Sequence, residues 1–285
     1  MELYSEIPVV ETIKKRTSVR TYNEKSLLSG EIKEKLSRFS SLLKGPFGKS
    51  SRFEIIESDI ARRDANVRLG TYGVIRGAET YVVAAVKKGE KDLEEFGYIF
   101  ESFILYATSL GLGTCWLGGT FKKSEFSKAI GQKDDEILPC ISPLGFPGGR
   151  RSLLESTMRF SVGSDKRKSW KELFFQRGFH KALTAAEAGK YVIPLEMVRL
   201  APSASNKQPW RILQDESVYH FYLQHTKGYA KPLGYDIQRV DLGIAMSHFE
   251  HTARELGISG KWLHIPPQDV SVPSDTEYII SWREG

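Results

Sequence analysis

The sequence predicts an α+β protein built from two related halves in one chain. Its first half alternates short strand-like runs with helical patterns, and the longest predicted helix, residues 92–110, is apolar on nearly every side. With an offset of 146, residues 95–117 align with residues 241–263 and share seven identical positions, where chance gives about one or two. This repeat indicates a duplicated helix–glycine–strand unit, whose long helix is buried or packs against a symmetric partner.

The remaining elements follow from local patterns. Pro8 stands in the first turn of a predicted helix, where its missing N–H costs nothing, and residues 29–32 open a second helix. Asp92 is the expected N-cap of the long helix, and Gly111 ends it. A glycine-containing loop, residues 72–78, receives no assigned role. The predicted strands are residues 53–56, 80–86, 137–144 and 277–282.

Composition and charge exclude several classes of protein. The 285 residues are 40% hydrophobic and 27% charged, as in ordinary globular proteins. The first residues lack the pattern of a secretory signal, and no apolar run approaches the roughly 18 residues of a membrane helix, so we expect a cytoplasmic protein without a membrane partner. Cys115 and Cys140 are expected as reduced core residues, and no metal-binding spacing is present. The net charge of +6 is spread over short clusters without an RNA-binding motif, so no nucleic-acid partner is expected.

A basic segment near the N-terminus is a candidate phosphate site. Arg16 and Arg20 flank Ser18 within five residues, and Thr17 lies between them. The guanidinium fork suits bidentate contacts to phosphate, and a serine hydroxyl adds a neutral hydrogen bond. Such runs are common, so the spacing alone predicts the site only weakly.

A polar loop in the second half is the other candidate site. Pro202 resists continuation of the preceding helix, and Pro209 restricts the residue before it to extended conformations. Between them, two serines, an asparagine and a glutamine can present hydroxyl and amide groups to a flat polar ligand. The alternative interpretation is an ordinary helix end followed by a turn.

Three runs together resemble the flavin-dependent nitroreductase superfamily, tandem-duplicated branch. A-P-S-A-S-N-K-Q-P-W-R, from Ala201, is similar to the A-P-S-x-x-N-x-Q-P-W signature of that family, R-T-S-V-R-T-Y to its R-x-S-x-R motif, and L-G-L-G-T-C-W-L-G to its glycine run beside the flavin. The resemblance implies a nitroreductase-like fold, with mostly antiparallel sheets packed by helices, and FMN as cofactor. The flavin-site residues that it implies are Arg16, Thr17, Ser18, Arg20, Leu117, Gly118, Gly119, Arg167, Pro202, Ser203, Ala204, Ser205, Asn206 and Gln208.

The placement of the motifs implies an intramolecular pseudodimer. In the family, the phosphate motif and the A-P-S loop of one flavin site come from opposite subunits. Here residues 1–173, the predicted N-terminal half, retain the first motif and lack the second at residues 43–53, whereas residues 174–285 retain only the second. We therefore expect one composite site per chain, in a monomer that is itself a pseudodimer and that could pair further as a homodimer.

The resemblance implies an FMN-dependent oxidoreductase that takes electrons from NAD(P)H and passes them to a nitroaromatic, quinone or similar small-molecule acceptor. Reductive dehalogenation or flavin cleavage on the same scaffold is an alternative, as is a non-catalytic flavin-binding or ligand-sensing protein. No nucleophile arrangement is visible and none is required, because the cofactor carries the chemistry. His248 is the most tempting catalytic acid, but its place in the second long helix favours a hydrogen-bonded core residue.

Overall fold

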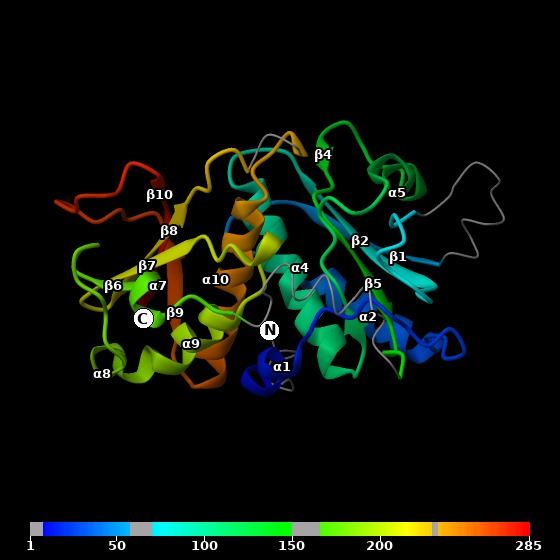
Figure 1. Ribbon diagram of the computed structural model, residues 1–285, viewed down its shortest axis with the longest axis horizontal. Coiled ribbons are helices and arrows are strands. Elements are labelled where there is room, and N and C mark those ends of the chain that lie inside the picture. The colour runs from blue at the N-terminus through cyan, green and yellow to red at the C-terminus, as the bar shows by residue number, and fades with distance from the viewer. Residues whose placement is uncertain (1–7, 58–69, 150–165, 230–232) are drawn as a thin grey trace.

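The computed structural model describes residues 8–57, 70–149, 166–229 and 233–285. Two sheets lie on opposite sides of a central pair of long helices, α4 and α10, so that the order across the molecule is sheet, helix, helix, sheet (Figure 1). The first residues and residues 150–165, with the basic pair of residues 150 and 151, fall outside the described residues.

The first half forms an antiparallel sheet of order β1–β2–β5–β3, with β4 also on β2. Ser29 caps the second helix by accepting the N–H of Ile32. Asp92 is not the N-cap of α4: Lys91 takes that place, and the Asp92 carboxylate accepts the N–H of Gly89. The elements are α1 (Val9–Lys15), α2 (Gly30–Leu42), β1 (Ser51–Glu57), β2 (Thr80–Lys87), α4 (Asp92–Ser109), β3 (Gly113–Thr114), α5 (Lys123–Ala129), β4 (Glu136–Ile137) and β5 (Ile141–Gly145).

The second half forms a sheet of order β6–β7–β8–β10–β9, in which β6 and β7 are parallel and the other pairs antiparallel. Residues 166–173, which precede this sheet, already pack against it: Lys168 N–H donates to the Gln208 side chain. The elements are α7 (Trp170–Leu173), β6 (Phe174–Gln176), α8 (Ala185–Ala188), η2 (Gly189–Tyr191), α9 (Val192–Leu200), η3 (Ala204–Asn206), β7 (Trp210–Asp215), β8 (Val218–Gln224), α10 (Gln238–Glu255), β9 (Gly260–Leu263) and β10 (Thr276–Glu284).

The repeat predicted from the sequence is visible in the central helix pair. The bounds of α4 and α10 differ by the same offset of 146, and the two helices cross where Gly97 meets Gly243. A Cβ on Gly97 would lie 2.1 Å from the Val240 carbonyl oxygen, and one on Gly243 would lie 2.1 Å from that of Glu94. These two contacts are equivalent under the repeat, so the halves are related by an approximate two-fold operation, as in a symmetric dimer.

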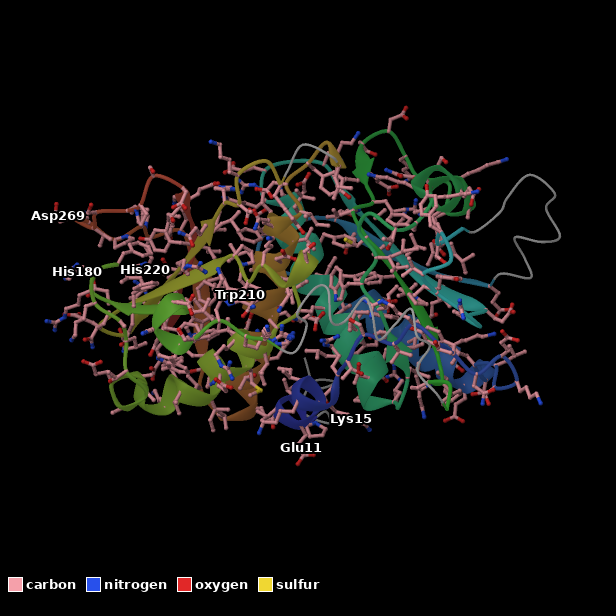
Figure 2. All side chains as sticks on the ribbon, viewed as in Figure 1. Glu11, Lys15, His180, Trp210, His220 and Asp269 are labelled. Atoms are coloured by element: carbon pink, nitrogen blue, oxygen red, sulfur yellow. The ribbon has the colours of Figure 1, made fainter. Side chains whose placement is uncertain are left out.

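One hydrophobic core is continuous through both halves. It contains Phe96, Phe100 and Phe103 of α4 together with Ile244 and Phe249 of α10. In Figure 2, Trp210 lies inside the protein, whereas Glu11, Lys15 and Asp269 lie at its rim. The α+β prediction, with a mostly antiparallel sheet in each half and the halves joined through the long helices, is confirmed. No helix in the described part of the chain has the length and apolar character that crossing a membrane requires.

Candidate functional site

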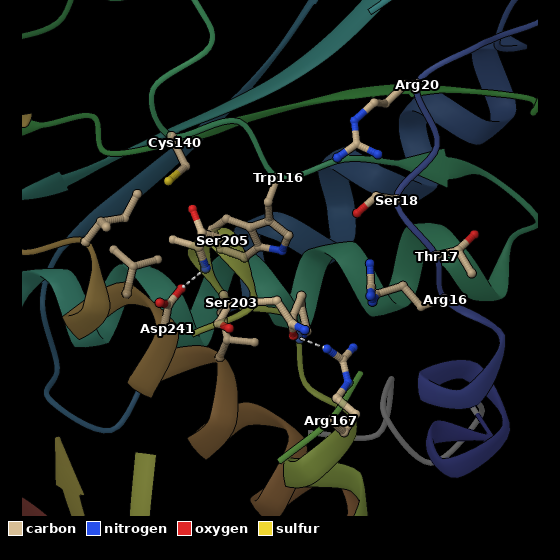
Figure 3. Close-up of a pocket in the computed structure, with 17 residues that line it drawn as sticks. Arg16, Thr17, Ser18, Arg20, Trp116, Cys140, Arg167, Ser203, Ser205 and Asp241 are labelled. Atoms are coloured by element: carbon tan, nitrogen blue, oxygen red, sulfur yellow. Dashed lines mark hydrogen bonds between the residues drawn. The ribbon is translucent and has the colours of Figure 1, made fainter. Parts of the chain in front are cut away.

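The basic segment after α1 is extended, and this conformation aligns its functional side chains. Arg16 leaves the helix with φ −58° and ψ 124°. Ser18 then pairs with Thr114, and the Val19 N–H donates to the Thr114 carbonyl at 2.8 Å. Alternate residues of an extended chain share one side, so Arg16, Ser18 and Arg20 face the same way. Figure 3 shows all three directed toward one cavity, while Thr17 points away from them.

The 72–78 loop helps to hold this segment in place. Arg76 N–H donates to the Arg20 carbonyl at 2.9 Å, and its carbonyl accepts the N–H of Tyr22 at 2.9 Å. Gly113 is required on the other side, because a Cβ there would lie 2.9 Å from the Val19 side chain. Backbone hydrogen bonds on both sides thus hold residues 16–20 in place. The side chains of Arg16, Ser18 and Arg20 do not take part in these bonds and can contact a ligand.

Two arginines of this segment carry buried N–H groups without a partner. Nε and Nη1 of both Arg16 and Arg20 are inaccessible to water and make no hydrogen bond to the described residues. An unsatisfied buried donor costs about 1–3 kcal/mol, and more when it is charged. Such groups persist where something else supplies the acceptor, and an anion such as a phosphate group fits that requirement.

The loop after α9 is strained. α9 ends at Leu200, before Pro202, and three non-glycine residues then adopt left-handed backbone angles: Ser205 (φ 48°), Asn206 (φ 53°) and Gln208 (φ 50°). Each residue in this region costs of the order of 1 kcal/mol or more, and such clusters occur where the surrounding structure imposes them. The left-handed Gln208 shows that the prediction of an extended residue before Pro209 was wrong, and the strain makes this loop a candidate ligand-binding element.

Contacts from two parts of the chain impose this shape. Asp241 Oδ1 on α10 accepts the N–H of Ala204 at 2.9 Å. Arg167 donates to the Asn206 side chain and to the Leu200 carbonyl. Gln208 Oε1 accepts the N–H of Lys168 at 2.8 Å, so residues 166–168 and α10 together fix the loop.

The extended segment, the loop and α10 enclose a cavity of about 310 Å³, a size typical of small-ligand and cofactor sites. In Figure 3 the arginines lie at one end of this cavity, whereas Asp241 and Cys140 lie at the other. Its lining residues are Arg16, Thr17, Ser18, Arg20, Trp116, Gly118, Cys140, Arg167, Pro202, Ser203, Ala204, Ser205, Asn206, Ile237, Val240, Asp241 and Ile244. The cavity therefore suits an elongated ligand with an anionic end and a flat, largely apolar end.

All but three of the predicted site residues line this cavity. Leu117 does not, because its backbone N–H and carbonyl bond Ile141 and its side chain is buried in the core. Gly119 does not line it either: it is exposed, and its nearest neighbour is the Leu233 side chain. Gln208 is buried, and its side chain bonds Lys168, Lys166 and Asn206, so it holds the loop instead of facing the ligand.

The residues that the sequence analysis missed lie mostly on α10. Ile237, Val240, Asp241 and Ile244 form the wall of the cavity. Trp116 also lines it, as does Cys140, which belongs to the hydrophobic core as predicted. The four helix positions have the i, i+3, i+4, i+7 spacing of one helix face. The sequence does contain a signal for this wall, because Asp241 interrupts an otherwise apolar helix face. The loop that this face contacts, however, is set by the tertiary structure.

Burial changes the protonation of two groups at the Asp241 end. Asp241 is 2% exposed, and this burial raises its pKa to about 8, while the Ala204 N–H opposes the rise and nearby Asp236 adds to it. The carboxyl is therefore neutral at pH 7. Burial also raises the pKa of the Cys140 thiol, which stays protonated and lacks the reactivity of a thiolate.

The equivalent region of the other half is closed by charged side chains. Lys91, Glu94, Glu95 and Tyr98 on α4 correspond to Ile237, Val240, Asp241 and Ile244 on α10 under the offset of 146. Glu94 forms an ion pair with Arg239 at 2.7 Å, and Glu95 accepts the N–H of Phe47 at 2.8 Å and that of Lys49 at 3.1 Å. Tyr98 donates to Glu250 at 2.5 Å. The apolar residues Ile237, Val240 and Ile244 thus have polar counterparts, while Asp241 has the acidic Glu95, which is bonded to backbone N–H groups. This asymmetry favours a single ligand site.

His248 lies away from the cavity lining. It is fully buried between Met197, whose carbonyl is 2.9 Å from Nδ1, and Glu101, whose carboxylate is 2.9 Å from Nε2. The other oxygen of Glu101 accepts the indole N–H of Trp116 at 2.7 Å, and Trp116 lines the cavity. His248 is therefore a core residue that helps to fix the carboxylate behind the cavity wall.

The whole fold is shared with a solved nitroreductase structure. The crystal structure of a "putative nitroreductase" from Thermotoga maritima MSB8 matches with a TM-score of 0.60 and 23% identity, over 96% of this chain and 93% of that chain. The family model described as "Putative TM nitroreductase" matches residues 8–253. Because this match spans most of the 285 residues, the chain belongs to that nitroreductase family.

Shorter nitroreductases match about half of the chain. A nitroreductase family protein of Clostridium novyi NT is 22% identical over 50% of this chain and 87% of its own, with a TM-score of 0.42. A "putative nitroreductase" of Desulfovibrio desulfuricans, solved in complex with FMN, is 23% identical over 53% of this chain and 95% of its own, with a TM-score of 0.40. None of the curated proteins compared matches this chain.

Proposed function

We propose that the protein is an FMN-dependent oxidoreductase with one flavin site per chain. The observation that carries the proposal concerns Arg16 and Arg20, whose buried Nε and Nη1 atoms have no partner among the described residues, at one end of a cavity of cofactor size. Membership of a nitroreductase family supports the choice of flavin. When bound, FMN supplies two-electron redox chemistry between NADH or NADPH and a nitroaromatic, quinone or similar acceptor.

The roles of the chain's own residues follow from their positions. Arg16, Ser18 and Arg20 hold the phosphate end by charge-assisted and neutral hydrogen bonds. Arg167 lines the cavity beside them while its guanidinium braces the Asn206 side chain. At the other end, Trp116 with the Ile237, Val240 and Ile244 side chains provides the apolar wall for a ring and excludes water from it.

We also propose a cellular compartment, an oligomeric state and a class of partners for the protein. We place it in the cytoplasm, acting on small molecules as a single-chain pseudodimer that could pair further, with neither nucleic acid nor membrane as a partner. The reducing cofactor and the acceptor class are those that the motif resemblance implies.

The first test is the visible absorbance of the protein as purified, followed by release and identification of the chromophore. We expect one FMN per chain, because Lys91, Glu94 and Tyr98 stand where the other half presents the apolar Ile237, Val240 and Ile244. Absence of flavin after incubation with excess FMN would overturn the proposed function, and two FMN per chain would overturn the single site. Oxidation of NADH and NADPH by the flavin-loaded protein, with nitroaromatic and quinone acceptors, then tests the reaction.

A further inference from the structure

Asp241 has an uncommitted polar atom at the far end of the cavity from the arginines. Its Oδ1 accepts the N–H of Ala204 at 2.9 Å, but its Oδ2 is buried and has no partner among the described residues. The loop needs only the first of these oxygens. A buried polar atom without a partner costs free energy, so the second oxygen implies a group supplied by a ligand.

The surroundings of Asp241 disfavour the charged form. Among the described residues, no cation pairs with its carboxyl. The ionisable groups there that act on it are the Asp236 carboxyl just before α10, the Cys140 thiol and the Tyr229 phenol. A thiol and a phenol are neutral when protonated, so neither supplies a positive charge. Because burial raises the pKa of both Cys140 and Tyr229, neither group titrates near neutral pH. The arginines of the cavity lie at its opposite end (Figure 3).

We propose that Asp241 acts as a neutral hydrogen-bond donor to the bound ring, and that it selects a flat heteroaromatic ligand with an acceptor atom, such as a ring nitrogen or a carbonyl oxygen. This inference rests on the proposed function, in which the isoalloxazine of FMN is such a ring. Since Oδ1 accepts the N–H of Ala204, the proton of the neutral acid resides on Oδ2, and in this proposal Oδ2 donates it to the ligand. Deprotonation replaces this donor by a buried negative charge facing the acceptor, which weakens binding.

The sign of the pH effect follows from the carboxyl's pKa of about 8 in the free protein. A ligand that binds only the protonated form loses affinity as the pH rises through this pKa. The FMN dissociation constant of the wild-type protein, measured by quenching of flavin fluorescence, is therefore expected to rise about tenfold between pH 7 and pH 9. The phosphate of FMN is already dianionic at pH 7, so its titration contributes little in this window.

Asp241→Asn is the matched variant. Its amide oxygen can still accept the Ala204 N–H and its NH₂ group still donates at the position of Oδ2, but it does not titrate. We expect FMN binding by this variant to be independent of pH, with a dissociation constant that stays flat from pH 7 to pH 9. The variant also corrects for Lys168, whose pKa burial lowers to about 8 and which therefore titrates in the same window.

The outcomes separate this inference from the proposed function. Equal wild-type affinity at pH 7 and pH 9, or a tenfold loss that persists in Asp241→Asn, overturns the role of Asp241 and leaves the flavin site intact. No measurable FMN binding at pH 7 overturns the proposed function itself. Should Asp241→Asn fail to fold, the pH profile of Lys168→Met, which lacks the other group that titrates near pH 8, decides the matter: a loss of FMN affinity between pH 7 and pH 9 supports the role of Asp241, and a flat profile overturns it.

Discussion

Replacing Arg16 and Arg20 together by alanine is expected to weaken FMN binding by about a hundred- to ten-thousandfold. Each charge-assisted hydrogen bond contributes roughly 1.5–3 kcal/mol, and the double variant loses at least one from each arginine. The folded state should not suffer, because the Nε and Nη1 atoms removed are buried and have no partner in the described part of the chain. Flavin content after purification and the FMN dissociation constant measure the first effect, and the thermal midpoint of the flavin-free protein measures the second.

Lys14 and Lys15 provide the matched control for this experiment. They are exposed, lie at the end of α1 beside Arg16, and their double replacement by alanine removes the same two charges. We expect near wild-type affinity, since exposed charges outside the cavity act only through screened, long-range attraction. Equal losses in the two double variants would show that net charge, and not the geometry of the cavity, governs binding. Full flavin occupancy of the arginine variant would refute the site.

The second large effect is expected at the crossing of α4 and α10. Gly97→Ala or Gly243→Ala introduces a methyl group 2.1 Å from a backbone carbonyl oxygen of the facing helix, which cannot rotate away as a side chain can. The helices must separate, and the shared core must separate with them. We expect each substitution to lower the free energy of unfolding by roughly 3 kcal/mol or more, the upper part of the range for overpacked cores. Urea unfolding measures this change.

FMN affinity should fall in the same variants, because Val240, whose carbonyl opposes Gly97, also lines the cavity. Gly30→Ala is the control: Gly30 is the first residue of α2, and an added Cβ meets nothing within 4 Å. Alanine is a better helix former than glycine, so this variant is expected to be as stable as the wild type or slightly more stable. Wild-type stability of Gly97→Ala would contradict the close helix crossing.

Much of the fold was predictable because its elements are encoded locally. Ser29 marks a helix start through a cap that involves only its own first turn, and the β-rich runs at β1 and β2 are recognisable by composition. Two signals predicted the long helices: the apolar pattern of residues 92–110, and the repeat, which places a second helix at the equivalent positions. The N-cap of α4 was missed by one residue, because Lys91 in a left-handed conformation carries no sequence signal while the neighbouring aspartate does.

The residues of the site were harder to predict. Whether a polar residue lines the cavity depends on whether its polar groups already bond to other parts of the folded chain. Arg16, Ser18 and Arg20 could be assigned from the motif that they resemble, although their spacing alone is a weak signal, and an extended chain turns that spacing into a common side. Leu117 and Gln208 could not be excluded from the sequence, since their hydrogen bonds to Ile141 and Lys168 exist only in the folded chain. The role of Asp241 depends likewise on burial, which the sequence of α10 does not reveal.

The fusion of the two halves has a consequence for how the cavity is assembled. One wall comes from residues 16–20 and the other from α10 and the loop before β7, all on one polypeptide. A site shared by separate subunits is lost on dilution, whereas tethered walls face each other at an effective concentration of the order of millimolar, whatever the protein concentration. Each wall can also mutate without its copy changing. Glu94 could thus become an ion-paired acid while its counterpart Val240 stayed apolar.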